Sequence, residues 1–111
     1  MKPIRQQKAQ GDVLFSPAAL VGTPKGKVRA APLENGRYIF ARGEVTGHHH
    51  SAAPETCTLN LDEGGVMWLT VEQLTEVVHQ EHAVQVLEPG IYRVDLQKEA
   101  DAWDGWRPVA D

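Results

Sequence analysis

The chain has a single cysteine, Cys57, among its 111 residues. One thiol excludes an internal disulfide framework and a zinc site built from several thiolates. No apolar run approaches the length that spans a bilayer, and the opening residues lack the apolar stretch of a secretory signal. We therefore expect a cytoplasmic protein with no membrane partner.

Several motifs of known enzyme classes are also missing. The sequence has no glycine-rich phosphate loop, no nucleophile elbow and no pair of carboxylates with diagnostic spacing. Cys57 lies on the apolar side of an alternating segment, so we expect a buried core thiol rather than a nucleophile. The five histidines are left as the main candidates for chemistry.

The size and composition fit one folded domain. A length of 111 residues, 41% hydrophobic and 23% charged, is typical of a single globular unit. We expect residues 1–10 to be a flexible basic arm, residues 11–100 a β domain, and residues 101–111 a tryptophan-containing tail that packs on it. A core this small gains stability from a bound metal or from self-association, so a homo-oligomer is expected.

The net charge of −4 hides an asymmetry between the two parts of the chain. Residues 1–42 carry eight Lys or Arg and two acids, a net of +6, whereas residues 43–111 carry three and thirteen, a net of −10. We expect basic strands to lie beside acidic ones in a sheet or across a subunit interface. The basic residues lack interleaved aromatics, so we do not expect nucleic-acid binding.

Turn signals separate short segments with β patterning. Asn35-Gly36 and residues 62–65 predict hairpin turns. Segment 70–82 fits both a helical stripe and a strand, and its neighbours favour the strand. The fold predicted is mainly β, a small single-domain antiparallel barrel or sandwich of seven to nine strands. The other predicted strands are residues 13–15, 37–45, 56–61, 66–69, 84–87 and 91–96.

The histidines fall in two clusters, at residues 48–50 and 79–82. We place the first cluster at the end of the strand that begins at Arg37, before a small-residue loop at 51–55. Residues two apart on a strand face the same side, so His48 and His50 would point together while His49 faces away.

The second cluster supplies another pair of side chains. On a helix His79 and His82 share a face, whereas on a strand His79 and Glu81 do. The two clusters together predict a metal site whose ligands are His48, His50, His79 and His82.

Imidazoles suit zinc, nickel, copper or Fe(II) better than calcium or magnesium, and zinc is the metal expected. Three ligands leave a position for water, with Glu81 as catalytic base, whereas four ligands close the site as a structural one. The function predicted is a small metal-binding β domain with a histidine-rich site, with metal-dependent hydrolysis left open. The alternatives are a non-catalytic protein that forms a homo-oligomer or docks on a partner, and a histidine-based pH switch.

Four blocks of the sequence resemble a small uncharacterised bacterial family with TGHxH and HxEH motifs. They are residues 11–14, 41–50, 79–82 and 89–94. The resemblance implies that the site residues are His48, His50, His79, Glu81 and His82, and implies no activity.

The HxH pair is also loosely similar to the first motif of cupin barrels. The carboxylate that follows at the expected short distance is Glu55, and the later histidine precedes the Pro89-Gly90 turn, where a cupin's follows it. No enzyme activity is carried over from this likeness.

Overall fold

The computed structural model describes residues 8–42 and 48–96. The predicted tail at 101–111 and residues 1–7 of the predicted arm lie outside the described residues. No helix within the described ranges is long and apolar enough to cross a membrane. The described residues form one short helix, α1 Ala18–Val21, and ten strands: β1 Lys8–Gln10, β2 Val13–Pro17, β3 Arg29–Ala30, β4 Tyr38–Arg42, β5 His49–Ala52, β6 Cys57–Leu61, β7 Met67–Val71, β8 Thr75–Val77, β9 Gln85–Leu87 and β10 Gly90–Leu96.

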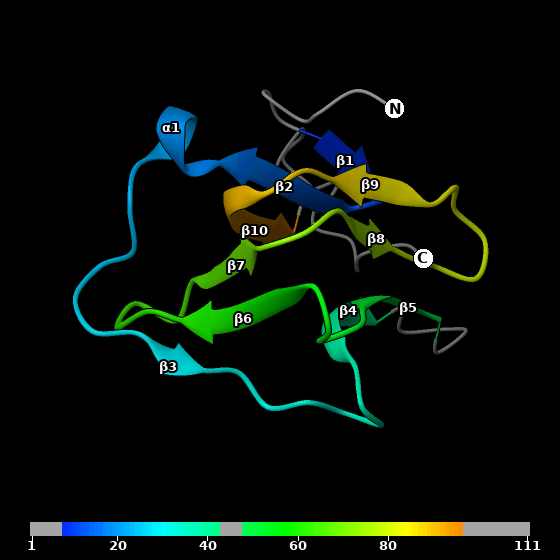
Figure 1. Ribbon diagram of the computed structural model, residues 1–111, viewed down its shortest axis with the longest axis horizontal. Coiled ribbons are helices and arrows are strands. Elements are labelled where there is room, and N and C mark those ends of the chain that lie inside the picture. Colours follow the sequence, from blue (N-terminus) through cyan, green and yellow to red (C-terminus); the bar gives the residue numbers. More distant parts are fainter. Residues whose placement is uncertain (1–7, 43–47, 97–111) are drawn as a thin grey trace, which may run out of the picture.

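Six of these strands form one antiparallel sheet in the order β1-β2-β10-β7-β6-β3 (Figure 1). Two hairpin-like pairs, β4–β5 and β8–β9, lie outside it. An isolated bridge joins these pairs, in which the backbone N–H of Ser51 donates to Val78 O at 3.0 Å and that of Val78 donates to Ser51 O at 2.9 Å.

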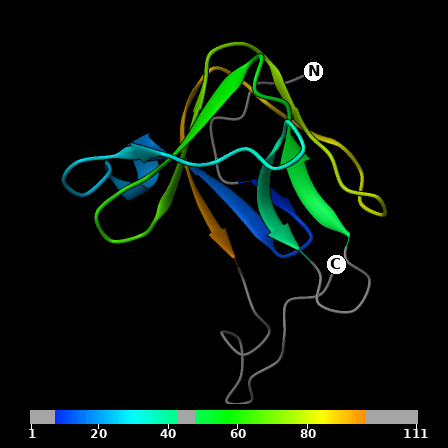
Figure 2. The ribbon, with the colours of Figure 1, turned by 90° about the horizontal axis from the view of Figure 1, so that it is seen from below.

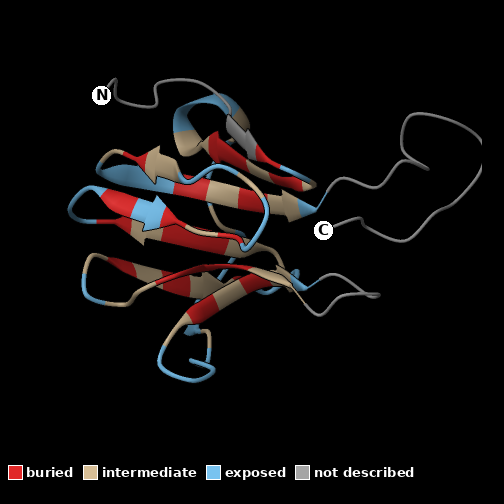
Figure 3. Cartoon of the chain, turned by 90° about the vertical axis from the view of Figure 1, so that its right-hand side faces the viewer, coloured by how far each residue is buried: buried red, intermediate tan, exposed pale blue. Residues whose placement is uncertain are grey.

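The core lies between the six-stranded sheet and the two pairs (Figure 2). Phe15 of β2 meets Phe40 of β4 edge to face, with ring centroids 5.4 Å apart. Buried residues lie along the strands and exposed ones gather at the turns (Figure 3). The predicted mainly β, antiparallel fold is confirmed, and among the described strands the sheets form a sandwich rather than a closed barrel.

Strand alternation explains much of this packing. On β10, Tyr92 and Val94 are buried whereas Ile91 is 45% exposed, as the pattern of residues 91–96 predicts. The Asn35-Gly36 turn is also confirmed, because both residues have positive φ, 51° and 75°. Glu34 and Arg37 exchange two backbone hydrogen bonds across it, at 2.8 and 3.0 Å.

Segment 70–82 follows the strand interpretation in its first part. β7 extends to Val71 and β8 covers Thr75–Val77, so the helical alternative is wrong. Neither predicted geometry holds for the second histidine cluster, which lies in the loop between β8 and β9. The chain bends there because His79 Nδ1 accepts the backbone N–H groups of Glu81 and His82, which ends the strand pairing.

The first histidine cluster also lies differently from the prediction. β4 ends at Arg42, residues 43–47 lie outside the described ranges, and His49 begins the separate strand β5. Ser51 and Ala52, predicted as loop, belong to β5 and are 1% and 0% exposed. Small side chains fit a fully buried strand as well as a loop, and here the pairing with β4 decides between the two.

The N-terminal residues 8–10, predicted as part of the arm, form strand β1. They pair with β2 across the two-residue turn Gly11-Asp12, and Gln10 is 2% exposed. Gly11 has a φ of 56°, the positive value that hairpin turns of this length need at their first central residue.

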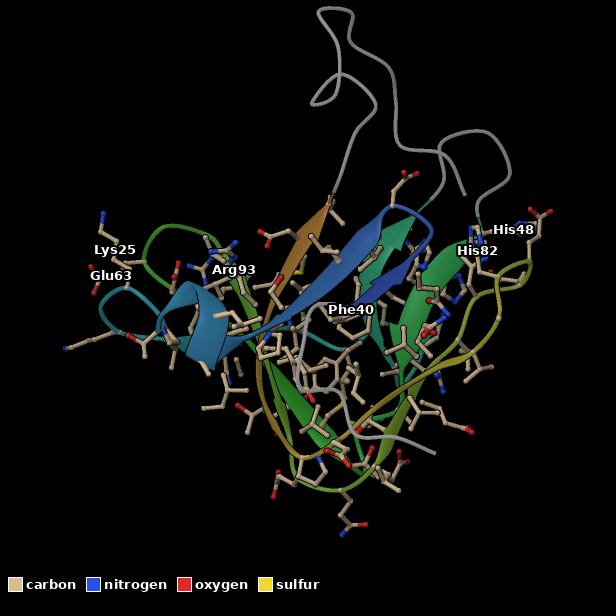
Figure 4. The ribbon with its side chains drawn as sticks, turned by 90° about the horizontal axis from the view of Figure 1, so that it is seen from above. Lys25, Phe40, His48, Glu63, His82 and Arg93 are labelled. Atoms are coloured by element: carbon tan, nitrogen blue, oxygen red, sulfur yellow. The ribbon has the colours of Figure 1, made fainter. Side chains whose placement is uncertain are left out.

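As predicted, strands of the basic part pair with strands of the acidic part, β2 with β10 and β3 with β6. The two parts also meet at the end of the molecule that carries Lys25 and Glu63 (Figure 4). Their contacts here are made by the backbone: Lys25 N–H donates to Asp62 Oδ2 at 3.0 Å, and Lys27 N–H donates to Glu63 Oε2 at 2.7 Å. The Arg42–Glu34 and Arg93–Asp95 ion pairs each join residues of one part only.

The side chain of Asp62 accepts four hydrogen bonds at this end of the molecule. Its carboxylate accepts the N–H groups of Lys25, Gly64 and Val66 and the indole N–H of Trp68, at 2.8–3.0 Å. The N–H of Lys25 and then that of Trp68 favour the charged form and lower the pKa of Asp62 to about 2, against an ordinary 3.8.

The pH dependence of stability provides a test of this carboxylate. Because the folded-state pKa is the lower one, the contribution is complete above pH 3.8 and is lost as the pH falls to about 2. We expect Asp62→Asn to unfold at lower urea concentration than the wild type at pH 7, and this difference to shrink between pH 3.8 and about 2. A difference that stays constant down to pH 2 would show that the charge of Asp62 is not its source.

Candidate metal centre

Three histidines from two parts of the chain converge at one end of the sandwich. His50 comes from β5, and His79 and His82 come from the β8–β9 loop; each offers a nitrogen atom, and these atoms all lie within 4.8 Å of one another. His50 and His79 are buried, and their ring centroids are 4.3 Å apart. Nitrogen ligands around a tetrahedral zinc ion are about 3.3 Å apart. Small side-chain movements therefore suffice for the three to hold a metal ion.

Gln10 determines the tautomer of His50. Its Nε2 donates to Val77 O and Ala83 O, both at 2.9 Å, and these two carbonyls settle the orientation of the amide. Gln10 Oε1 is therefore an acceptor, and His50 Nδ1, 2.9 Å away, donates its proton to it. His50 Nε2 then carries the lone pair that a metal needs, the arrangement typical of metal-binding histidines.

The β1–β2 turn packs directly on the ring of His82. A Cβ atom added at Gly11 would lie 2.7 Å from His82 Nε2. This nitrogen is buried and makes no hydrogen bond with any described residue. The imidazole of His82 therefore packs against the backbone of Gly11, where a side chain on residue 11 would clash with it.

His79 is tied to its own loop. Its Nδ1 accepts the N–H of Glu81 at 3.0 Å and that of His82 at 3.3 Å, so the ring proton of the neutral form is on Nε2. To bind a metal through Nε2, His79 would have to carry its proton on Nδ1 instead, which ends these two hydrogen bonds; to bind through Nδ1 it would have to turn its ring. Metal binding would therefore be coupled to the conformation of the 79–82 loop.

His48 and Glu81 lie beside the three histidines. His48 Nδ1 is 3.5 Å from Glu81 Oε1, and its ring centroid is 5.7 Å from that of His79. His48 and His82 appear together at this end of the molecule (Figure 4). Of the four predicted ligands, the structure brings nitrogen atoms of His50, His79 and His82 within 4.8 Å of one another, and His48 lies beside this group. The side chain of Glu81, the predicted base, is 59% exposed.

Two residues of this centre, Gln10 and Gly11, are not among the site residues that the sequence predicts. Both fall in or next to the segment predicted as an arm, where the composition gives no sign of burial. The dipeptide Gly11-Asp12 could have identified them, because it is typical of a two-residue hairpin turn. Such a turn pairs Gln10 with Val13, as the structure shows.

Cys57 takes no part in the centre. It is 1% exposed, as expected for a core thiol, and donates to Ala53 O at 3.3 Å. Burial raises the pKa of the thiol, which keeps it protonated.

Comparison with known proteins gives a family but no activity. No curated protein and no solved structure matches the chain. The sequence model of a family described as "Domain of unknown function (DUF8820)" matches residues 9–97, which include Gln10, Gly11 and all five histidines. The resemblance to a small uncharacterised family agrees with this match, while its motifs and the cupin likeness stay predictions. The chain belongs to the DUF8820 family of domains of unknown function.

Proposed function

We propose that this protein binds one divalent transition-metal ion through His50, His79 and His82, with zinc as the expected ion. The observation that carries the proposal is the convergence of three imidazoles whose nitrogen atoms lie within 4.8 Å of one another. Imidazole nitrogen favours zinc, nickel, copper or Fe(II) over the oxygen-seeking calcium and magnesium ions.

The surroundings of the three histidines support this proposal. Gln10 orients His50 by a hydrogen bond to the nitrogen that would face away from a metal, the role such partners have in metal sites. The ligands come from strand β5 and from the β8–β9 loop, so an ion would tie together segments that are distant in sequence. Such a link supplements the stability of a small core.

The role of His48 would decide whether such a centre is closed or open to water. His48 as a fourth ligand would close it, whereas three ligands leave room for a water molecule, which a bound metal would activate as a Lewis acid. In the open form, we propose that the exposed Glu81 carboxylate, 3.5 Å from His48 Nδ1, accepts a proton from that water. We propose that the open centre catalyses hydrolysis, and we expect Glu81→Gln to keep the metal and lose this activity.

The test is elemental analysis of untagged protein. We expect about one metal ion per chain in the wild type and none in the His50→Ala/His82→Ala variant. His49→Ala is the matched control, because His49 is next to His50 in the sequence, lies outside the three converging histidines and interacts with Gln80 instead. Its metal content should equal that of the wild type.

A different pair of results would contradict the proposal. If wild-type protein carries no metal and added zinc, nickel, copper or iron leaves its melting temperature unchanged, the centre does not bind metal. Normal stability and normal assembly of the double variant would then favour the non-catalytic alternative, a protein that self-associates or docks on a partner.

A further inference from the structure

A second candidate site lies on the outer face of the β8–β9 pair, and none of the three converging histidines lines it. A hollow of about 520 Å³ opens there, and its lining includes Arg37, Leu74, Glu76, Val78 and Val86. Pockets that hold small molecules have volumes of about 300–1,000 Å³. The hollow is therefore large enough for a small organic ligand.

Strand alternation gives this groove an apolar floor. On β8, Thr75 and Val77 are buried in the core, so the residues between and after them, Glu76 and Val78, face outward. Glu76 pairs with Val86 of β9, which lines the groove beside it. Leu74 is 51% exposed and adds a further apolar side chain.

Arg37 supplies the positive charge of the groove. Its Nε donates to Ser51 Oγ at 2.9 Å, which anchors the guanidinium, and its terminal N–H groups make no hydrogen bond to residues 8–42 or 48–96. No carboxylate of the described residues forms an ion pair with Arg37, in contrast to Arg42 and Arg93. An anchored guanidinium with two terminal nitrogens matches the geometry of a carboxylate.

The groove continues toward the histidine centre. A smaller hollow of about 190 Å³ is lined by Ser51, Val78 and His79, among others, so it shares Val78 with the groove. Ser51 links the two by its hydrogen bond to Arg37. A ligand held on Arg37 would therefore extend along Val78 in the direction of His79.

We infer that this groove binds a small monocarboxylate with an apolar chain. Its carboxylate pairs with Arg37, and its chain lies on Leu74, Val78 and Val86. Glu76, exposed on the same face, repels a second negative charge and so disfavours dicarboxylates. The inference does not depend on the metal, because no residue of the three-histidine group lines this groove.

The test uses the whole 111-residue chain, labelled with ¹⁵N and titrated with hexanoate while amide chemical shifts are followed. A ligand of this size is expected to bind with a Kd of about 1 mM. Hexanol and hexylamine have the same chain with a neutral and a cationic head group, and both should bind at least about tenfold more weakly. The shifts should be largest at Arg37, Leu74 and Val86.

Four variants assign the contacts. Arg37→Gln and Leu74→Ser should weaken hexanoate binding, the first by about tenfold or more because it removes the charge. Glu76→Gln should strengthen binding, which keeps the inference testable if Arg37→Gln fails to fold. Arg42→Gln is the control, because Arg42 is paired with Glu34 outside the groove, and it should bind like the wild type.

Three results would overturn the inference. They are equal binding of hexylamine and hexanoate, unchanged affinity in Arg37→Gln, and no shifts in the groove at about ten times the expected Kd. All titrations are made with metal-free and metal-loaded protein. Hexanoate binding without any metal would support the groove even if the metal proposal fails, and metal binding without hexanoate binding would do the reverse.

Discussion

Replacing Gln10 with alanine is expected to lower the metal affinity of the protein by about 10- to 100-fold, the usual effect of removing the partner of a metal-binding histidine. His50 loses the acceptor that holds its Nδ1 proton and orients its ring. Val77 O and Ala83 O lose their donor at the same time. Each buried group left without its partner costs about 1–3 kcal/mol, so the variant should also unfold at lower urea concentration.

Gln10→Glu separates these two effects. An ionised glutamate still accepts the His50 proton, but it cannot donate to Val77 O or Ala83 O. We expect it to keep more of the metal affinity than Gln10→Ala does, with a comparable loss of stability. Competition with a chelator of known affinity measures the first quantity and urea unfolding of the metal-free protein the second. Wild-type metal affinity in Gln10→Ala would show that Gln10 does not position His50.

Gly11→Ala should disturb both the fold and the centre. Gly11 has a φ of 56°, and for a residue with a side chain this conformation costs about 1–2 kcal/mol. The added Cβ would also lie 2.7 Å from His82 Nε2, so the imidazole has to move. We expect a lower melting temperature together with weaker metal binding.

Gly36→Ala is the matched control for this substitution. Gly36 has a φ of 75°, and an added Cβ meets no atom within 4 Å. It should show the conformational cost alone and keep wild-type metal affinity. If the two alanine variants bind metal equally well, the contact between Gly11 and His82 has no part in the site.

Much of the fold could be predicted because its signals are local. Asn35-Gly36 predicts its turn since both residues tolerate positive φ, which depends on the two residues alone. The alternation of residues 91–96 predicts which side chains of β10 face the core. The boundaries of β5 and β8 could not be predicted, because the pairing partners of these strands decide them.

The candidate metal centre could likewise be predicted only in part. The clustering of histidines at 48–50 and 79–82 identifies the residue types and the metals that they favour without any structure. Spacing alone could not show that His50 joins His79 and His82 while His48 lies beside Glu81, because His48 precedes β5, and the start of that strand is decided by its pairing with β4.

The sequence by itself therefore determined the fold class, the positions of the main turns and the chemistry of the candidate ligands, since each depends on a residue and its near neighbours. Only the tertiary structure decided that Gln10 is buried against His50, 40 residues away, and that Gly11 contacts His82. Contacts of this kind arise when the two layers close around a common core, and no local pattern of the chain encodes which distant groups then meet.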